Sequence, residues 1–416
     1  MRGNNLDSVR RNNLSIVLDI VNRQGAVARA GVTRATGLNR STVAAIVGRL
    51  VELRLVVESE PETPASVGRP SPMINPDPAC VAIAVNPELD AVTVAIVGLG
   101  GRVIARLRNP VDHAITATET GEIVGRMLRT LQPELATKRV MGLGVAVPGL
   151  VRASDGLVRW APHLDWTDEP IATILQTSTG YRTFVSNDAS VGAVAEHIFG
   201  AGIGVGDMIY LNGGASGIGG GVIASGVLLG GAGGFAGEFG QNRPGIRSAA
   251  DRTTTDGTLE DEVSRSRLLA AVALEEADET TLALALDGSA DAAVLDELSR
   301  QARVLSVALS NAVNVLNPEL IVLGGFLAAV LRSDPDGLAA LVAAQSTGPS
   351  AEGVNIVPAA LGADLMLIGA AQLVFDELVA DPEAYATAAA PGASDSGTVD
   401  GPGHNGVMSN VEVGRL

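Results

Sequence analysis

The chain has 416 residues, a formal net charge of −17 and one cysteine, Cys80. A chain of this length is expected to fold as two or three domains, and a single cysteine excludes an internal disulfide or a multi-cysteine metal site. The sequence has no apolar leader and no apolar stretch of about 18 residues, so we expect a cytoplasmic protein that does not span a membrane. Its 50 glycines and its low aromatic content of 3% favour α/β domains with tight loops.

The charge of the chain is divided unevenly. Residues 1–75 contain ten arginines and six acidic residues, and therefore carry a charge of +4. The rest of the chain contains the other 19 basic and 40 acidic residues and carries −21. This division predicts that a small basic head contacts a polyanion, whereas repulsion keeps the acidic body away from it and leaves the body another role.

Residues 9–54 are predicted to form three helices. The first has one apolar face, made by residues at helical spacing: Leu14, Val17, Leu18 and Val21. A second, short helix is expected over residues 28–36, followed by a turn at Gly37 and a third helix that Asn39 caps. A short helix, a glycine turn and a helix with a polar first turn are typical of a helix-turn-helix, whose second helix enters the major groove of double-stranded DNA.

A winged variant is expected because residues 55–58 and 73–74 have the pattern of two strands around a proline-rich segment. The side chains that we expect to contact DNA are polar or basic: Arg29, Asn39, Arg40, Ser41, Thr42, Arg49 and Arg69. The alternative is a three-helix dimerisation or docking module with solvated arginines, and the division of charge favours DNA binding.

From Cys80 onward the pattern becomes that of an α/β body. Three antiparallel strands are expected first, then a helix, a buried strand that ends at Gly149, a second helix, a short strand and a third helix. Their approximate bounds are 81–85, 92–97, 103–107, 119–131, 140–147, 168–179, 183–185 and 189–199.

A glycine-rich segment, residues 212–221, lies between two apolar runs in the second half of the body. Such a segment lets backbone N–H groups approach phosphates or sugar hydroxyls, or it forms a tight hairpin. It lacks the Lys-Ser/Thr ending of a P-loop. Polar side chains in nearby loops suit a polyhydroxyl ligand, although each of them taken singly fits a solvated loop residue or a helix cap better: Asn187, Asp188, Glu238, Gln241 and Glu260.

Several segments, in this order, resemble the ROK family of repressors, open reading frames and kinases: 142–149, 161–166, 187–189, 217–221, 237–240 and 317–325. The resemblance covers residues 9–380 and implies a winged helix-turn-helix over residues 1–75. It also implies a two-lobed, actin-like (ribonuclease H-like ATPase) sugar-kinase fold over residues 79–380, with the lobe boundary near 190–200. Residues 382–416 lack periodicity, and we expect them to form a disordered tail.

The resemblance also implies a sugar site and identifies Asp188 as the position of the base that activates the sugar in kinases of the family. The residues carried over as contacts to an effector sugar are Gly149, Asn187, Asp188, Glu238, Gln241 and Glu260. Kinases of the family hold ATP phosphates with an Asp-x-Gly-Gly-Thr loop, whose place here is taken by residues 86–90, Asn-Pro-Glu-Leu-Asp. Gln241 takes the place of the zinc-binding histidine, and residues 242–259 contain no Cys or His, so we expect no metal and no cofactor.

Three functions are compatible with these patterns. The first is a sugar-responsive repressor of carbohydrate genes without catalysis, acting as a homodimer or homotetramer. The second is an active ATP-dependent sugar kinase with a DNA-binding or docking head. The third is an assembly protein whose head only dimerises. The altered phosphate loop argues against the second function, and the basic head argues against the third.

Overall fold

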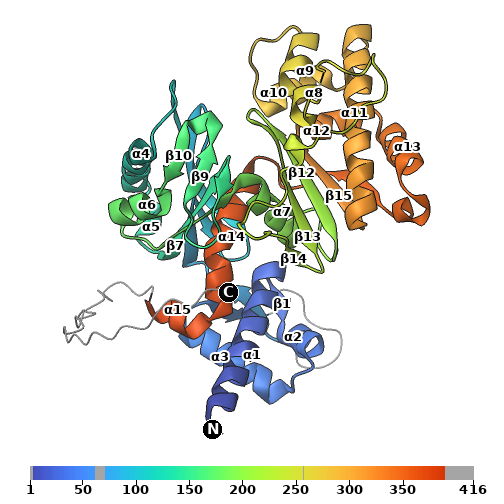
Figure 1. The fold of residues 1–416 in the computed structure, drawn as a ribbon. Coiled ribbons are helices and arrows are strands. Elements are labelled where there is room, and N and C mark those ends of the chain that lie inside the picture. The colour runs from blue at the N-terminus through green and yellow to red at the C-terminus, as the bar shows by residue number, and fades with distance from the viewer. Residues whose placement is uncertain (1–2, 61–70, 256, 389–416) are drawn as a thin grey trace, which may run out of the picture.

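The computed structural model describes residues 3–60, 71–255 and 257–388. A small helical head lies below two larger lobes, and two long helices lie where the lobes meet (Figure 1). The head contains three helices and three short strands: α1 (Gly3–Gln24), β1 (Val27–Ala28), α2 (Arg29–Thr36), α3 (Arg40–Glu52), β2 (Val56–Ser59) and β3 (Met73–Pro76). The strands form a sheet in the order β1-β3-β2.

The head has the helices that the sequence predicts. The four apolar residues of the predicted face of α1 are each at most 1% exposed and pack against α3. Gly37 ends α2 in the left-handed conformation, with a φ of 69°, and donates its N–H to the carbonyl of Thr33. Asn39 caps α3, because its side chain accepts a hydrogen bond from the N–H of Thr42 at 2.9 Å. The predicted wing tip, with Arg69, lies outside the described residues.

The first lobe is built on a five-stranded sheet in the order β11-β7-β4-β5-β6. Strands β4, β5 and β6 are antiparallel neighbours, whereas β7 is parallel to β4 and β11 is parallel to β7. A small sheet of β8, β9 and β10 lies beside it. The elements of this lobe are β4 (Cys80–Pro87), β5 (Ala91–Gly98), β6 (Arg102–Pro110), α4 (Ala117–Thr130), α5 (Gln132–Leu135), β7 (Arg139–Val147), β8 (Leu150–Val151), β9 (Val158–Ala161), β10 (Trp166–Glu169), α6 (Ile171–Thr179) and β11 (Thr183–Asn187).

The second lobe repeats this design, with a sheet in the order β14-β13-β12-β15-β16. On one side of the central strand β12, β13 is antiparallel to β12 and β14 is antiparallel to β13. On the other side, β15 and β16 run parallel to β12. Its elements are β12 (Met208–Gly214), β13 (Gly217–Ala224), β14 (Val227–Leu228), α8 (Leu259–Glu262), α9 (Arg265–Ala271), α10 (Glu279–Leu286), α11 (Ala292–Leu316), β15 (Leu320–Gly325), α12 (Phe326–Ser333), α13 (Pro335–Gln345) and β16 (Asn355–Pro358).

Helices α7 (Asp188–Phe199) and α14 (Leu365–Ala380) lie between the lobes (Figure 1). Two glycines let α14 pack at backbone distance. A Cβ added to Gly144 of β7 would lie 1.8 Å from the carbonyl oxygen of Ala370, and one added to Gly369 would lie 2.3 Å from that of Val191 on α7. Helix α14 therefore contacts the first sheet on one side and α7 on another, and it also contacts α1 of the head.

Of the two alternatives for the glycine-rich segment, the structure shows the tight hairpin, because β12 continues to Gly214 and β13 starts at Gly217. Two other expectations are wrong. The helix expected over 168–179 starts only at Ile171, because residues 166–169 pair with β9 as a strand. Residues 382–388 form a helix, α15 (Pro382–Ala388), in which Tyr385 and Ala386 are buried in the core that joins the head to the first lobe.

The remaining part of the expected tail, residues 389–416, lies outside the described residues. Within the residues that the structure does describe, no helix is long and apolar enough to cross a membrane.

Candidate functional site

Carboxylates from separate segments gather where the two lobes meet. Asp188 is the first residue of α7 and directly follows β11 of the first sheet, and Glu238 precedes the short 3-10 helix at Phe239–Gln241. Desolvation raises the pKa of the half-buried Asp188 to about 7, and the negative charges of Glu238 and Glu88 add to the shift. The pKa of Glu238 is also raised, first by partial desolvation and then by Glu260. These charge effects place the predicted acidic residues in one neighbourhood.

Glu260, on α8, is held against the β12–β13 hairpin and against Gln241. One carboxylate oxygen accepts the N–H of Ile218 at 3.1 Å, and the other accepts the side-chain amide of Gln241 at 2.6 Å. A Cβ on Gly217 would lie 2.4 Å from the first of these oxygens, so this position has no room for a side chain. The glycines of the hairpin therefore let a carboxylate approach the backbone.

Asn187 and Gly149 are joined by a hydrogen bond. The Asn187 amide donates to the Gly149 carbonyl at 3.0 Å, and its oxygen accepts the N–H of Ser190 at 2.9 Å as the cap of α7. Both ends of this side chain thus already have a protein partner. The geometry makes Asn187 a residue that fixes the start of α7, and with it the position of Asp188.

Glu88 also belongs to the carboxylate cluster, although it is not among the predicted sugar contacts. It lies in the short turn between β4 and β5, where the resemblance to the ROK family implies the phosphate loop of its kinases. Partial desolvation raises the pKa of Glu88, and Asp90 adds to the shift, whereas Arg108 opposes it. The signal in the sequence was the replacement of that loop by residues with acidic side chains. The cluster can accept hydrogen bonds from hydroxyl groups, and its charge opposes the binding of a phosphate.

An ion-pair network stabilises the segment that leads into α8. The Glu262 carboxylate, which is 1% exposed, accepts hydrogen bonds from backbone and hydroxyl groups of Thr253 and Thr254. Arg300 of α11 lies 3.5 Å from it and also donates to the carbonyl of Asp251 at 2.9 Å.

Among the described residues, no group of three or more His, Cys, Asp or Glu side chains could hold a metal ion. Cys80 is buried in β4, and desolvation raises the pKa of its thiol to about 12.

The first turn of α3 presents exposed polar groups. Arg40 and Ser41 are exposed, Thr42 is half-buried, and Arg40 forms no ion pair with any residue that the structure describes. The Ser41 hydroxyl donates to the Asn39 side chain at 2.7 Å. Asn39 is itself exposed, so this turn keeps its predicted residues together on the surface.

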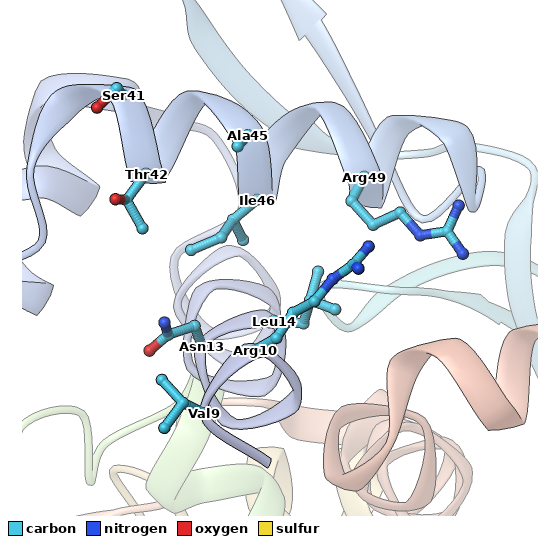
Figure 2. Close-up of a pocket in the computed structure, with 9 residues that line it drawn as sticks. All are labelled: Val9, Arg10, Asn13, Leu14, Ser41, Thr42, Ala45, Ile46 and Arg49. Carbon is cyan, nitrogen blue, oxygen red and sulfur yellow. The ribbon is translucent and has the colours of Figure 1, made fainter. Parts of the chain in front are cut away.

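Two of the predicted DNA contacts have partners inside the protein. Arg29 pairs with Glu58 of β2. Arg49 lies at the opposite end of α3 from Ser41 (Figure 2) and pairs with Glu52 at 2.9 Å and with Glu383 of α15 at 2.6 Å. Before either arginine could bind a phosphate it would have to give up these ion pairs.

A cavity of about 450 Å³ lies between α1 and α3 (Figure 2). Its lining combines the apolar Val9, Leu14 and Ile46 with Arg10 and Arg49. All of its lining residues belong to α1 and α3, and none of them is a member of the carboxylate cluster, so it is separate from the predicted sugar site.

Comparisons with known proteins agree with this architecture. The xylose repressor of Bacillus spizizenii is 24% identical over 381 residues, which cover 89% of this chain and 97% of that protein. The glucokinase of Halalkalibacterium halodurans is 30% identical over 255 residues, which cover 56% of this chain and 76% of that protein. A solved structure of a ROK family transcriptional regulator, a homologue of the E. coli MLC protein, shares the fold with a TM-score of 0.73 at 21% identity, over 91% of this chain and 99% of that one.

The family match covers both lobes of the body. The model of the ROK family aligns with residues 84–377, from β4 to α14. The chain belongs to the ROK family.

Proposed function

We propose that the protein is a sugar-responsive, DNA-binding repressor of carbohydrate uptake or metabolism genes, and that it has no kinase activity. The observation that supports this best is the combination, in one chain, of the exposed first turn of α3 on a basic head and the carboxylate cluster between the lobes. The similarity to xylose repressors extends over 89% of the chain, which is too far to be confined to the body.

The head acts as a winged helix-turn-helix with α3 in the major groove. Arg40 and Arg69 contact phosphates, while Asn39, Ser41 and Thr42 are placed to contact phosphates or base edges. The body carries the acidic excess of the chain and stays away from the duplex. The protein binds an inverted repeat as a homodimer or homotetramer, because each half-site takes one head.

The effector is a monosaccharide or a sugar derivative, bound between the lobes. The exposed Glu238 and Gln241 and the half-buried Asp188 and Glu260 supply acceptors and donors for adjacent hydroxyl groups. They come from both lobes, so a sugar that contacts all of them favours one angle between the lobes over another. Such differential affinity is what an allosteric response requires. Sugar binding then releases the operator.

The same region lacks what phosphoryl transfer needs. Catalysis of that reaction depends on positioning and neutralising the transferred phosphate. The turn between β4 and β5 offers no glycine amides and no hydroxyl, and Glu88 adds a negative charge where the phosphates would lie.

A second candidate function, an active sugar kinase, has one observation in its favour. Asp188 occupies the position of the family's base, and its pKa of about 7 suits a group that accepts a proton at neutral pH. An assay for ATP-dependent phosphorylation of hexoses and pentoses distinguishes the candidates, because a repressor without catalysis gives no signal above an Asp188→Asn variant.

The experiment that tests the proposal is selection of bound duplexes from a random DNA pool, followed by affinity measurement on the selected site. Arg40→Ala should weaken binding and flatten its salt dependence. Arg129→Ala, which removes an exposed arginine from α4 of the body, is the matched control and should leave both unchanged. Failure to select any sequence, or equal effects of the two substitutions, would refute DNA recognition by the head.

A further inference from the structure

Helix α7, which begins at the carboxylate cluster, is fastened to the start of α14. Glu196 of α7 is fully buried, and one of its carboxylate oxygens accepts the N–H groups of Ala360 and Leu361, both at 2.9 Å. Those residues directly precede the short 3-10 helix at Gly362–Asp364, which leads into α14. The close approach of Gly369 to the backbone of Val191 joins the same two helices further along. A ligand at Asp188 that displaced α7 would therefore also move α14.

Helix α14 reaches the head through a buried pair of amides. The side chain of Asn22, in α1, donates to the side-chain oxygen of Gln372, in α14, at 3.1 Å. Asn22 is fully buried and Gln372 is 2% exposed. Gln372 in turn donates to Asp376 at 2.7 Å, so the orientation of its amide is fixed.

The same asparagine also contacts the first lobe. The oxygen of its side chain accepts the N–H of Gly100, in the turn between β5 and β6, at 3.0 Å. Asn22 is thus bonded at one end to α14 and at the other to the first lobe. A movement of α1 relative to α14 or to this turn would break or bend one of these bonds, because hydrogen bonds weaken steeply as they are misaligned.

The head has another attachment to the first lobe, which supplies a fixed point. Arg139, the first residue of β7, donates to the carbonyl of Leu53 at the end of α3 at 2.6 Å and also to the carbonyl of Ala386 in α15. This attachment and the Gly100 bond hold the head to the first lobe, whereas the Gln372 bond ties it to α14. Because α14 packs at backbone distance against β7, the head is placed to follow α14 and the first lobe together.

We infer that Asn22 and Gln372 form the joint that sets the orientation of the head and passes the sugar signal to it. The inference rests on the proposed function and adds two positioning residues that contact neither DNA nor sugar. Replacing both side chains by apolar groups would also remove the acceptor of the Gly100 N–H, so the pair contributes to stability as well as to the position of the head. What it provides is a fixed, directional contact between α1 and α14.

The test uses Gln372→Met, which keeps the length of the side chain and removes its hydrogen bonds. Glu377→Gln is the matched control, since Glu377 lies on the same helix and its ion pair with Arg182, at 3.4 Å, is exposed and points to the first lobe. Gln372→Asn, which keeps the amide but shortens its reach, replaces the Met variant if that variant does not fold. D-xylose and D-glucose are the probes, and calorimetry gives sugar affinity while fluorescence anisotropy gives operator affinity with and without saturating sugar.

In the wild type, the sugar should weaken operator binding by about 5- to 150-fold, the usual range of allosteric coupling. In Gln372→Met, sugar affinity should be unchanged and the weakening should fall below about threefold, while Glu377→Gln should respond like the wild type. If a Gln372 variant binds sugar and releases DNA as the wild type does, the inference that Asn22 and Gln372 form the joint is wrong, while the proposed repressor function still holds. A wild type that binds no operator, or does not release it with either sugar, overturns both.

Discussion

Replacing Glu262 by glutamine should strongly destabilise the second lobe. The carboxylate is 1% exposed and lies 3.5 Å from Arg300. It accepts hydrogen bonds, at 2.6 to 3.1 Å, from the backbone N–H and the hydroxyl group of both Thr253 and Thr254. Glutamine turns one of these acceptors into a donor that faces other donors and leaves Arg300 with less negative charge. Arg300 keeps its ion pair with Glu297 at 2.8 Å, so the substitution costs less than the about 3–5 kcal/mol of a buried charge left without a partner. The main loss is that of two hydrogen bonds to a charged group, at about 1.5–3 kcal/mol each.

The shift is measured by urea unfolding followed by circular dichroism, comparing transition midpoints because a chain with several domains need not unfold in two states. Glu122→Gln, at an exposed position of α4, is the control and should change stability by less than about 0.5 kcal/mol. The Glu262→Gln variant should also bind sugar more weakly than the wild type, because Glu260 lies two residues earlier on the same short helix. Equal midpoints for the two variants would show that the network does not stabilise this lobe.

The effect of Glu262 should also depend on pH. Burial acts to raise the pKa of Glu262, but hydrogen bonds from Thr253 and Thr254 outweigh it, and the net pKa is lowered in the folded protein. Its contribution to stability is therefore complete above the unfolded value of about 4.3 and disappears as the pH falls through the lower folded value. The stability difference between wild type and Glu262→Gln should shrink below about pH 4.

Three further outcomes are expected. Arg40→Ala should reduce the slope of log affinity against log salt concentration by about 1, as the loss of one phosphate contact does, and binding assays at several salt concentrations measure this. Asp188→Asn should flatten the pH dependence of stability: because the folded pKa of Asp188 is raised to about 7, the wild type should lose stability as the pH rises from about 4 to 7, and unfolding at a series of pH values would show whether the variant does so too. Purified protein should transfer no phosphate from ATP to D-glucose or D-xylose. Turnover that Asp188→Asn abolishes would contradict the interpretation that residues 86–90 cannot hold the phosphates of ATP.

The helices of the head could be predicted because each carries a local signal. The four apolar residues of α1 repeat at helical spacing, and Asn39 has the side chain of an N-cap directly before α3. Helix α15 could not be predicted, because a helix of seven residues is not stable alone and this one depends on burying Tyr385 and Ala386 in the core between head and body.

The composition of the site was easier to predict than its geometry. Asp188, Glu238, Gln241 and Glu260 follow from motifs, and the structure brings them into one neighbourhood. Other features of the site depend on how the chain folds locally and on contacts between segments far apart in the chain. They are the role of Asn187 as a cap, the effect of Glu88 on the pKa of Asp188, and the Glu262–Arg300 ion pair. No periodicity or spacing in the sequence carries that information.

The measurement that decides whether this protein is a sugar-controlled repressor is operator binding by the wild type and by Glu238→Ala across a titration of the effector sugar. Glu238 is exposed in the cluster, and loss of a hydrogen bond from a sugar hydroxyl to this charged carboxylate costs about 1.5–3 kcal/mol, or roughly 10- to 150-fold in sugar affinity. The variant should bind the operator like the wild type without sugar and should need that much more sugar to release it. Release of both proteins at the same sugar concentration would contradict the placement of the effector between the lobes.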